Sequence, residues 1–296
     1  MLAIYEVDPG GERLSVRIQE DWAIFTLSSE QVDAFLASMF PEGDQLLGDD
    51  VRVRLRSRAD GVIADHAKSW AAFSDEIRSN NRYFPRAVPD GELLSRVLLN
   101  SVLHIDPDID LYRARPCGTN LLTSDDMSAP PPELATGGRA NPIGIPYLYL
   151  GYSEQTCIYE TRVSNHSRVA VARFRPTRRV AVLNLADIAV PDFFSIPEVE
   201  SVDDQISQVE LYRYLCALSG ELSKPVRSSD QPTDYIPTQY LCEMAKSLDL
   251  DGVLYSSSLD PGGRNVVLFD TGTAQCMGDP TTYQITSLTA EWTATT

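Results

Sequence analysis

The stretch GVLYSSSLDPGGRNVVLF at residues 252–269 carries two apolar runs on either side of a turn. Gly252 to Tyr255 and Asn265 to Phe269 are short and rich in β-branched and aromatic residues, which is typical of buried strands. Pro261-Gly262-Gly263 lies between them and supplies residues that favour a turn. The stretch therefore predicts a pair of neighbouring strands inside a sheet.

Further elements of the same kind precede this pair. Apolar runs predict strands over residues 146–150, 169–174 and 180–185. Helical spacing of apolar residues predicts helices from Ser153 to about 163, over about 203–222, and over 238–248. Strands and helices that mix without strict alternation predict an α+β fold.

The first part of the chain has weaker signals. Alternating polar and apolar residues predict strands over 14–18 and 51–55, and helical spacing predicts helices over 28–39, 63–79 and 90–103. A turn at Asp106-Pro107-Asp108 marks the expected boundary. We therefore expect a small α+β accessory or regulatory domain at 1–105 and a catalytic domain at 106–296.

Composition narrows the classes of function. The chain has 296 residues, of which 43% are hydrophobic and 23% charged, as in ordinary globular proteins. Its net charge of -17 repels phosphate backbones and argues against a nucleic-acid partner. A local arginine cluster can still bind one small phosphate ligand in such a protein. No G-x-G-x-x-G motif opens a βαβ unit and there is no P-loop, which disfavours a Rossmann dehydrogenase.

Cysteine and histidine patterns predict neither a metal nor a disulfide framework. The five cysteines are widely spread without C-x-x-C spacing, and the three histidines form no metal-spaced pair. The sequence begins without a signal-peptide pattern, and no apolar run approaches the roughly 18 residues of a membrane span. We expect a soluble cytoplasmic protein with no metal and no membrane partner.

Three separated blocks carry residues suited to chemistry. They are Leu111-Tyr112-Arg113-Ala114-Arg115, then residues 137–150 continuing to Glu160, and finally residues 255–265. Together, over about residues 109–270, these blocks resemble the RES domain family, which is named for an arginine, a glutamate and a serine. The order is Arg113, Glu160 and a serine near 257. The Gly-Arg-Ala-Asn-Pro run at 138–142 resembles the longer branch of that family, which has an extra N-terminal region.

The resemblance implies a fold and a reaction. The fold is an ADP-ribosyltransferase-like split sheet with flanking helices. The reaction is cleavage of the nicotinamide–ribose bond of NAD by phosphorolysis or hydrolysis, so that NAD is a substrate, no cofactor is required, and inorganic phosphate or water is the acceptor. Many members are growth-inhibiting toxins held inactive by an antitoxin, which implies an antitoxin or other regulatory protein as partner. The 105 or so extra N-terminal residues depart from the compact toxins and leave that partner open.

The candidate site residues have fitting chemistry. Cleavage passes through an oxocarbenium-like ribose, whose positive charge a carboxylate such as Glu160 can stabilise. By resemblance, Arg113 and Arg139 hold the pyrophosphate as bidentate donors. Tyr149 is expected to stack on nicotinamide or to hydrogen-bond the ribose.

Two small polar side chains complete the set, namely Ser257 and Asn265. Ser256, Ser257 and Ser258 are consecutive, and the family pattern, which places the serine two residues after a tyrosine, selects Ser257.

Taken singly, each residue has a structural explanation. A helical glutamate is usually solvated, surface arginines form weak ion pairs, a strand tyrosine packs in a core, and a serine beside Gly-Gly belongs to a turn. Two other functions stay open. The protein could transfer ADP-ribose to a protein or nucleotide acceptor, or it could be a catalytically inactive module that binds a nucleotide or a partner chain.

Overall fold

The computed structural model describes residues 2–22, 25–41, 44–48, 50–57, 66–188, 201–224 and 231–288. Contacts divide the chain into two compact units. The first comprises Met1–Ala71 with Ile188–Ala217, and the second comprises Ala72–Asp187 with Leu218–Thr296. Two helices, α3 (His66–Ser79) and α6 (Val202–Ser223), begin in the first unit and end in the second.

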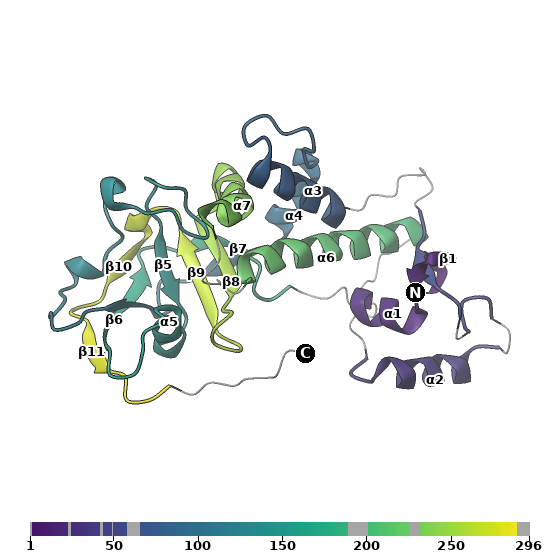
Figure 1. Cartoon of the computed structure of the whole chain (residues 1–296), viewed down its shortest axis with the longest axis horizontal. Helices are drawn as coiled ribbons and strands as arrows, with labels where there is room; N and C mark the ends of the chain where they lie inside the picture. The colour runs from purple at the N-terminus through teal and green to yellow at the C-terminus, as the bar shows by residue number, and fades with distance from the viewer. Residues whose placement is uncertain are drawn as a thin grey trace. The chain divides into compact units, whose positions relative to one another are not determined.

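The second unit is built on a nine-stranded mixed sheet. Its strands are β3 (Val102–Ile105), β4 (Leu111–Pro116), β5 (Leu148–Gly151), β6 (Arg168–Pro176), β7 (Val180–Asn184), β8 (Gly252–Ser256), β9 (Arg264–Leu268), β10 (Ala274–Cys276) and β11 (Thr281–Gln284). The order is β10-β6-β4-β5-β9-β8-β7-β3, with β11 also paired to β6 (Figure 1). The β7–β8 pair is parallel and the β8–β9 pair is the antiparallel hairpin predicted for residues 252–269.

The sheet has a narrow junction between β4 and β5. In the described residues these strands are joined by one residue pair, Tyr112 with Gly151. By contrast, β4 pairs with β6 along its whole length, and β5 does so with β9. The sheet therefore consists of two parts that separate beyond this pair. The predicted α+β class, with a split sheet and flanking helices, is confirmed.

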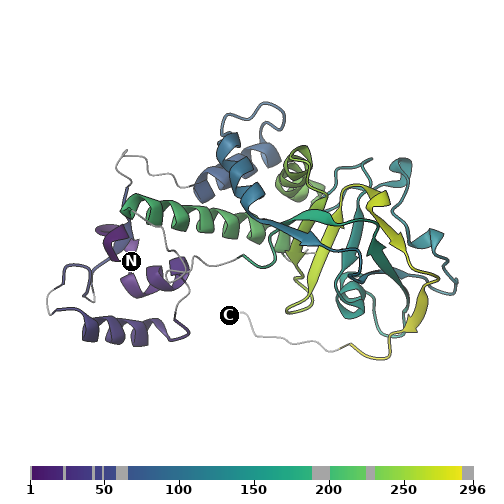
Figure 2. The same cartoon turned by 180° about the vertical axis from the view of Figure 1, so that it is seen from behind.

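Among the described residues of this unit, three α-helices lie wholly within it: α4 (Gly91–Asn100), α5 (Glu154–Glu160) and α7 (Ile236–Ser247). The α5 helix packs against β4, β5 and β6, whereas α7 packs against β8 (Figures 1 and 2). The Ser153 hydroxyl accepts a hydrogen bond of 3.0 Å from the Thr156 amide, so the predicted start of α5 is confirmed. Short 3-10 helices occupy Leu2–Ile4, Asp125–Met127, Pro132–Leu134, Pro232–Tyr235 and Thr271–Thr273.

The two faces of β6 bury alternate residues, as a covered strand must. Ala170, Ala172 and Phe174 belong to the main core of the sheet. Val169 and Val171 form a second cluster, against which Ile158 of α5 packs. This second cluster fixes α5 on the sheet.

The first unit contains β1 (Tyr5–Glu12), α1 (Leu14–Trp22), α2 (Ser29–Met39) and β2 (Val53–Leu55). The strands β1 and β2 are antiparallel. Ile18, Trp22 and Leu36 pack with Ile206 and Val209 of α6 in one core. The α6 helix thus supplies part of the core of this unit.

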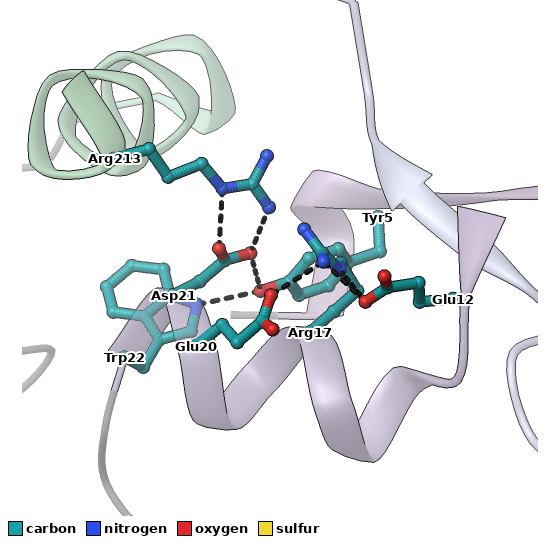
Figure 3. Close-up of polar contacts among 7 residues, drawn as sticks. All are labelled: Tyr5, Glu12, Arg17, Glu20, Asp21, Trp22 and Arg213. Atoms are coloured by element: carbon teal, nitrogen blue, oxygen red, sulfur yellow. Dashed lines mark hydrogen bonds and ion pairs between the residues drawn. The ribbon is translucent and has the colours of Figure 1, made fainter. Parts of the chain in front are cut away.

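An ion pair with a buried carboxylate also joins α1 to α6 (Figure 3). Arg213 donates two hydrogen bonds of 2.7 Å to the two carboxylate oxygens of Asp21, which is fully buried. The hydroxyl of Tyr5 donates to Asp21 at 2.8 Å and accepts from the indole N–H of Trp22 at 3.1 Å. Burial, followed by the charge of Asp21, raises the pKa of Tyr5 well above its usual value.

Two predictions for the first part of the chain were wrong in detail. Residues 14–18 were expected to form a strand, but they begin α1. Leu14, Ile18 and Trp22 are buried at helical spacing. Five alternating residues are too few to distinguish the two-residue period of a strand from the roughly 3.6-residue period of a helix. The helix expected over 90–103 ends at Asn100, because Val102 begins β3 and pairs with β7.

The remaining predictions for this region agree with the structure where it describes them. Residues 29–39 form α2, with Ser28 as its N-cap, and Val53–Leu55 forms β2. The helix expected over 63–79 is described from His66 to Ser79, and residues 63–65 lie outside the described residues. In the part of the chain that the structure describes, no helix is both long and apolar enough for a bilayer.

The compact units do not follow the boundary expected between residues 105 and 106. Residues 72–105 group with the large sheet, because β3 is its edge strand and α4 packs against α7. Residues 188–217 group instead with the N-terminal residues. A regulatory role for residues 1–105 stays a prediction.

Candidate active site

A pocket of about 310 Å³ opens where β4 and β5 separate. Its walls come from β4, β5, β8 and β9, from the C-terminal end of α5, and from the loop that precedes β5. Five of the predicted site residues line it directly, namely Arg113, Arg139, Tyr149, Glu160 and Asn265. The volume lies at the lower end of the range for small-molecule sites, roughly 300–1,000 Å³.

Glu160 is held from two sides by the β8–β9 hairpin. Its Oε1 accepts a hydrogen bond of 2.7 Å from the Ser257 hydroxyl and another of 2.7 Å from the side-chain amide of Asn265. Asn265 is buried, whereas Glu160 is exposed. Two donors on one oxygen fix the position of the carboxylate at the pocket.

The turn after β8 holds Ser257 in place. Its hydroxyl accepts hydrogen bonds of 3.1 Å from the amides of Leu259 and Asp260, and its own amide donates to the carbonyl of Gly263 at 2.8 Å. Because both lone pairs of the hydroxyl face these amides, its proton is directed to Glu160.

Asp260 connects this turn to the first turn of α5. Its carboxylate accepts hydrogen bonds from Thr156 at 2.6 Å and from Gln155 at 2.9 Å. A Cβ at Gly263 would lie 2.7 Å from the Asp260 carboxylate and 2.8 Å from the Thr156 hydroxyl, so only glycine fits there. The helix that carries Glu160 and the turn that carries Ser257 are therefore fixed to each other.

Tyr149 is anchored by the loop before β5. Its hydroxyl donates to the side-chain oxygen of Asn141 at 2.7 Å and accepts from the amide of Ala140 at 3.0 Å. Burial raises the pKa of Tyr149, so the hydroxyl stays protonated. A Cβ at Gly138 would lie 2.9 Å from this hydroxyl, which explains the glycine. With its proton committed to Asn141, Tyr149 offers a ligand mainly its ring.

Arg113 is a partly buried cation in the wall of the pocket. Its Nη1 is shielded from solvent and has no hydrogen-bond partner among the described residues. Burial, followed by the nearby charge of Arg115, lowers the pKa of Arg113 to about 10. The guanidinium is still charged at neutral pH, and an anionic ligand would supply the missing partner.

Arg139 is held more firmly. Its Nη1 donates to the main-chain oxygen of Leu222 at the end of α6, and its Cζ lies 5.9 Å from the centre of the Tyr255 ring. These contacts fix the side chain beside the pocket that it lines.

Cys157 lines the same pocket without the features of a nucleophile. Its thiol donates to the main-chain oxygen of Tyr112 at 3.0 Å. Burial raises the pKa of the Cys157 thiol to about 12, so the reactive thiolate is scarce at neutral pH. Within the described ranges, no group of three or more His, Cys, Asp and Glu side chains is placed to hold a metal ion.

The family profile described as "RES domain" matches residues 110–293, which is more than half of the chain. The chain belongs to the RES domain family. No curated protein matches it. Among solved structures, a similar chain comes from the M. tuberculosis MbcT–MbcA toxin–antitoxin complex, with 18% sequence identity and a TM-score of 0.35. That similarity covers 66% of this chain and 93% of the other.

Within the RES domain, the predicted site residues come together from three distant blocks. Five of them line the pocket, and Ser257 reaches it through its hydrogen bond to Glu160. Ser256 instead donates to the carbonyl of Ala186, and the buried Ser258 hydroxyl has no partner among the described residues. The geometry thus selects one of the three serines as the neighbour of Glu160, and its role in a reaction stays a prediction.

Sequence reasoning missed several residues of the RES domain pocket. Asp260 and Thr156 orient the site, and Tyr255, Cys157 and Arg162 line it. Asp260 stands in an Asp-Pro-Gly-Gly turn, which signals a turn but not a partner 104 residues away. Arg162 has a φ of 52° directly after α5, a backbone feature that no sequence pattern here signals.

Proposed function

We propose that this protein degrades NAD by cleaving the bond between nicotinamide and ribose. The observation that carries the proposal is the Glu160 carboxylate, which Ser257 and Asn265 hold at a pocket that also contains Arg113 and Arg139. A fixed carboxylate beside fixed cations suits a substrate that has both a developing positive charge and phosphates.

The arginines bind the pyrophosphate. Among the described residues, the buried Nη1 of Arg113 has no hydrogen-bond partner, and phosphate oxygens accept such donors in bidentate fashion. Arg139 is pre-oriented by Leu222 and Tyr255, so that little side-chain freedom is lost when it binds. The ring of Tyr149 then stacks on the nicotinamide or packs against the ribose.

The chemical step separates charge at the ribose. The electron pair of the C–N bond leaves with nicotinamide, which becomes neutral, and the ribose carbon becomes oxocarbenium-like. Glu160 stabilises this cation electrostatically. Attack by water gives ADP-ribose and releases a proton, whereas attack by hydrogen phosphate gives ADP-ribose phosphorylated at the same ribose carbon.

The biological consequence is growth inhibition. Loss of NAD stops the many reactions that depend on it, so we propose that the protein is a toxin or defence effector. A regulatory protein such as an antitoxin would hold it inactive, as the family resemblance implies.

The proposal is tested by chromatography of NAD incubated with the purified full chain, with and without phosphate. Release of nicotinamide supports it, and dependence on phosphate distinguishes phosphorolysis from hydrolysis. Label transferred from NAD to a macromolecule would indicate an ADP-ribosyltransferase instead. Intact NAD after long incubation, both alone and with a cell extract as a source of acceptors, would contradict the proposal and favour an inactive binding module.

A further inference from the structure

The pocket contains one more cation than the predicted site. Three arginines line it, Arg113, Arg139 and Arg162, against one carboxylate, that of Glu160. The protein as a whole carries a net charge of -17. A local excess of positive charge at one pocket of an acidic protein attracts an anionic ligand to that place.

Arg162 stands at a backbone position that favours glycine. The α5 helix ends at Glu160, Thr161 follows as its C-cap, and Arg162 then adopts a φ of 52°. Its amide closes the helix end by donating to the carbonyl of Tyr159 at 3.0 Å. Glycine or asparagine usually occupies this left-handed position, because a side chain strains it. The chain therefore keeps a strained arginine where glycine would end the helix at less cost.

The three arginines differ in exposure. Arg113 and Arg139 are partly buried in the wall of the pocket, whereas Arg162 is exposed at the pocket. It lies two residues after Glu160, so the helix end that presents the carboxylate also presents this cation. Backbone strain at a residue that lines a pocket supports a role for its side chain in binding.

We propose that Arg162 is a substrate-binding residue that contacts phosphate oxygens at the pocket, completing a set of three arginines. This inference rests on the proposed function for its ligand. The oxygens belong either to the pyrophosphate of NAD or to the inorganic phosphate that attacks the ribose. Arg162 acts on binding and leaves the bond-breaking step to the groups around Glu160.

The first test compares Arg162→Gln with Arg179→Gln, which removes the same charge from an exposed arginine paired with Asp106 outside the pocket lining. Arg162→Gln is expected to raise the KM for NAD about tenfold while kcat stays within about twofold, as for a lost binding contact. If the phosphate concentration needed for half-maximal rate rises instead, the ligand of Arg162 is the inorganic phosphate that attacks the ribose. Unchanged values for both, or equal effects of the two variants, would overturn the inference.

A second variant separates binding from folding. Arg162→Gly is expected to raise the melting temperature by about 2 °C, because it removes the strained Cβ, while it weakens binding as much as Arg162→Gln. Arg162→Lys should recover part of the affinity, since it restores the charge but not the planar fork. Full affinity in Arg162→Gly would overturn the inference.

A binding measurement keeps the test independent of turnover. Titration calorimetry with ADP-ribose is expected to show about tenfold weaker binding to Arg162→Gln than to the wild type. If the wild type binds ADP-ribose but releases no nicotinamide, the proposed reaction fails and the role of Arg162 stands. If the two proteins bind ADP-ribose equally, or neither binds it, the role of Arg162 fails.

Discussion

The hydroxyl of Ser257 donates a hydrogen bond of 2.7 Å to the carboxylate of Glu160, although 97 residues separate them in the chain. The contact joins the turn after β8 to the end of α5, and Asn265 of β9 donates to the same oxygen. It is the point at which two of the three sequence blocks of the RES domain meet. The third block contributes Arg113 to the same pocket.

The choice among three serines gives a first prediction. Ser257→Ala removes one of two hydrogen bonds to the Glu160 carboxylate, so we expect nicotinamide release to fall by about 10- to 100-fold. Ser258→Ala is the matched control, because its buried hydroxyl has no partner among the described residues. It should leave the rate unchanged and the stability unchanged or higher. Equal losses in both variants would show that Ser257 has no special role.

Tyr149 should contribute to stability as well as to binding. Tyr149→Phe leaves the side-chain oxygen of Asn141 and the amide of Ala140 without their partner, and Asn141 is buried. We expect the free energy of unfolding to fall by about 1–3 kcal/mol, measured by denaturant titration. Tyr159→Phe, at an exposed position of α5, should change it little. A stable Tyr149→Phe protein would contradict the role of the loop as an anchor.

The ion pair of the buried Asp21 carboxylate should stabilise the first unit more than the pairs that Arg17 forms with exposed carboxylates beside it (Figure 3). Arg213→Leu leaves the fully buried Asp21 carboxylate without its cation, which should cost about 3–5 kcal/mol of unfolding free energy. Arg17 pairs with exposed Glu12 and Glu20, so Arg17→Gln should cost at most about 1 kcal/mol. Denaturant unfolding of both variants measures these two losses. A larger loss in Arg17→Gln than in Arg213→Leu would contradict the prediction.

Tyr5 should make the first unit sensitive to alkali. Its pKa is raised above the usual value by burial and then by Asp21, and tyrosine in the unfolded chain titrates near pH 10. A raised pKa in the folded state means that stability is kept below about pH 10 and is lost as the pH rises beyond it. We expect a slope approaching about 1.4 kcal/mol per pH unit above pH 10.

The control for this slope is Tyr5→Phe, which cannot ionise at that position. Its unfolding free energy should be lower at neutral pH, because Asp21 and Trp22 lose a hydrogen-bond partner. It should depend less on pH between 10 and 11 than that of the wild type. An identical pH dependence in the two proteins would exclude Tyr5 as the source.

Much of the second unit could be predicted from the sequence because its strands are short, apolar and bounded by turn residues. The β8–β9 hairpin and the Ser153 cap depend on neighbours within a few residues. Predictions were wrong where a short pattern of apolar residues fits both a strand and a helix, as at residues 14–18. The sequence also did not reveal that β3 is an edge strand of the large sheet, since that pairing with β7 is a tertiary contact.

The residues of the site also fall into those that the sequence predicted and those that it did not. The residue types of the three blocks indicated Arg113, Tyr149 and Glu160, but single residues such as Asp260 gave no signal, because its partners Gln155 and Thr156 lie on another element. The strained Arg162 was missed for a different reason. A left-handed arginine looks in sequence like any surface arginine, and only the backbone angle and the pocket reveal it.

The most direct test of the role of Glu160 is the rate of nicotinamide release by Glu160→Gln compared with Glu154→Gln. Glu154 lies on the same helix, outside the pocket lining, and accepts a hydrogen bond from Tyr283. We expect Glu160→Gln to release nicotinamide about 100-fold or more slowly than the wild type while its melting curve stays unchanged, because the charge that stabilises the ribose cation is gone. Glu154→Gln should stay within about twofold of the wild type. Release by Glu160→Gln at the wild-type rate would contradict the central role given to this carboxylate.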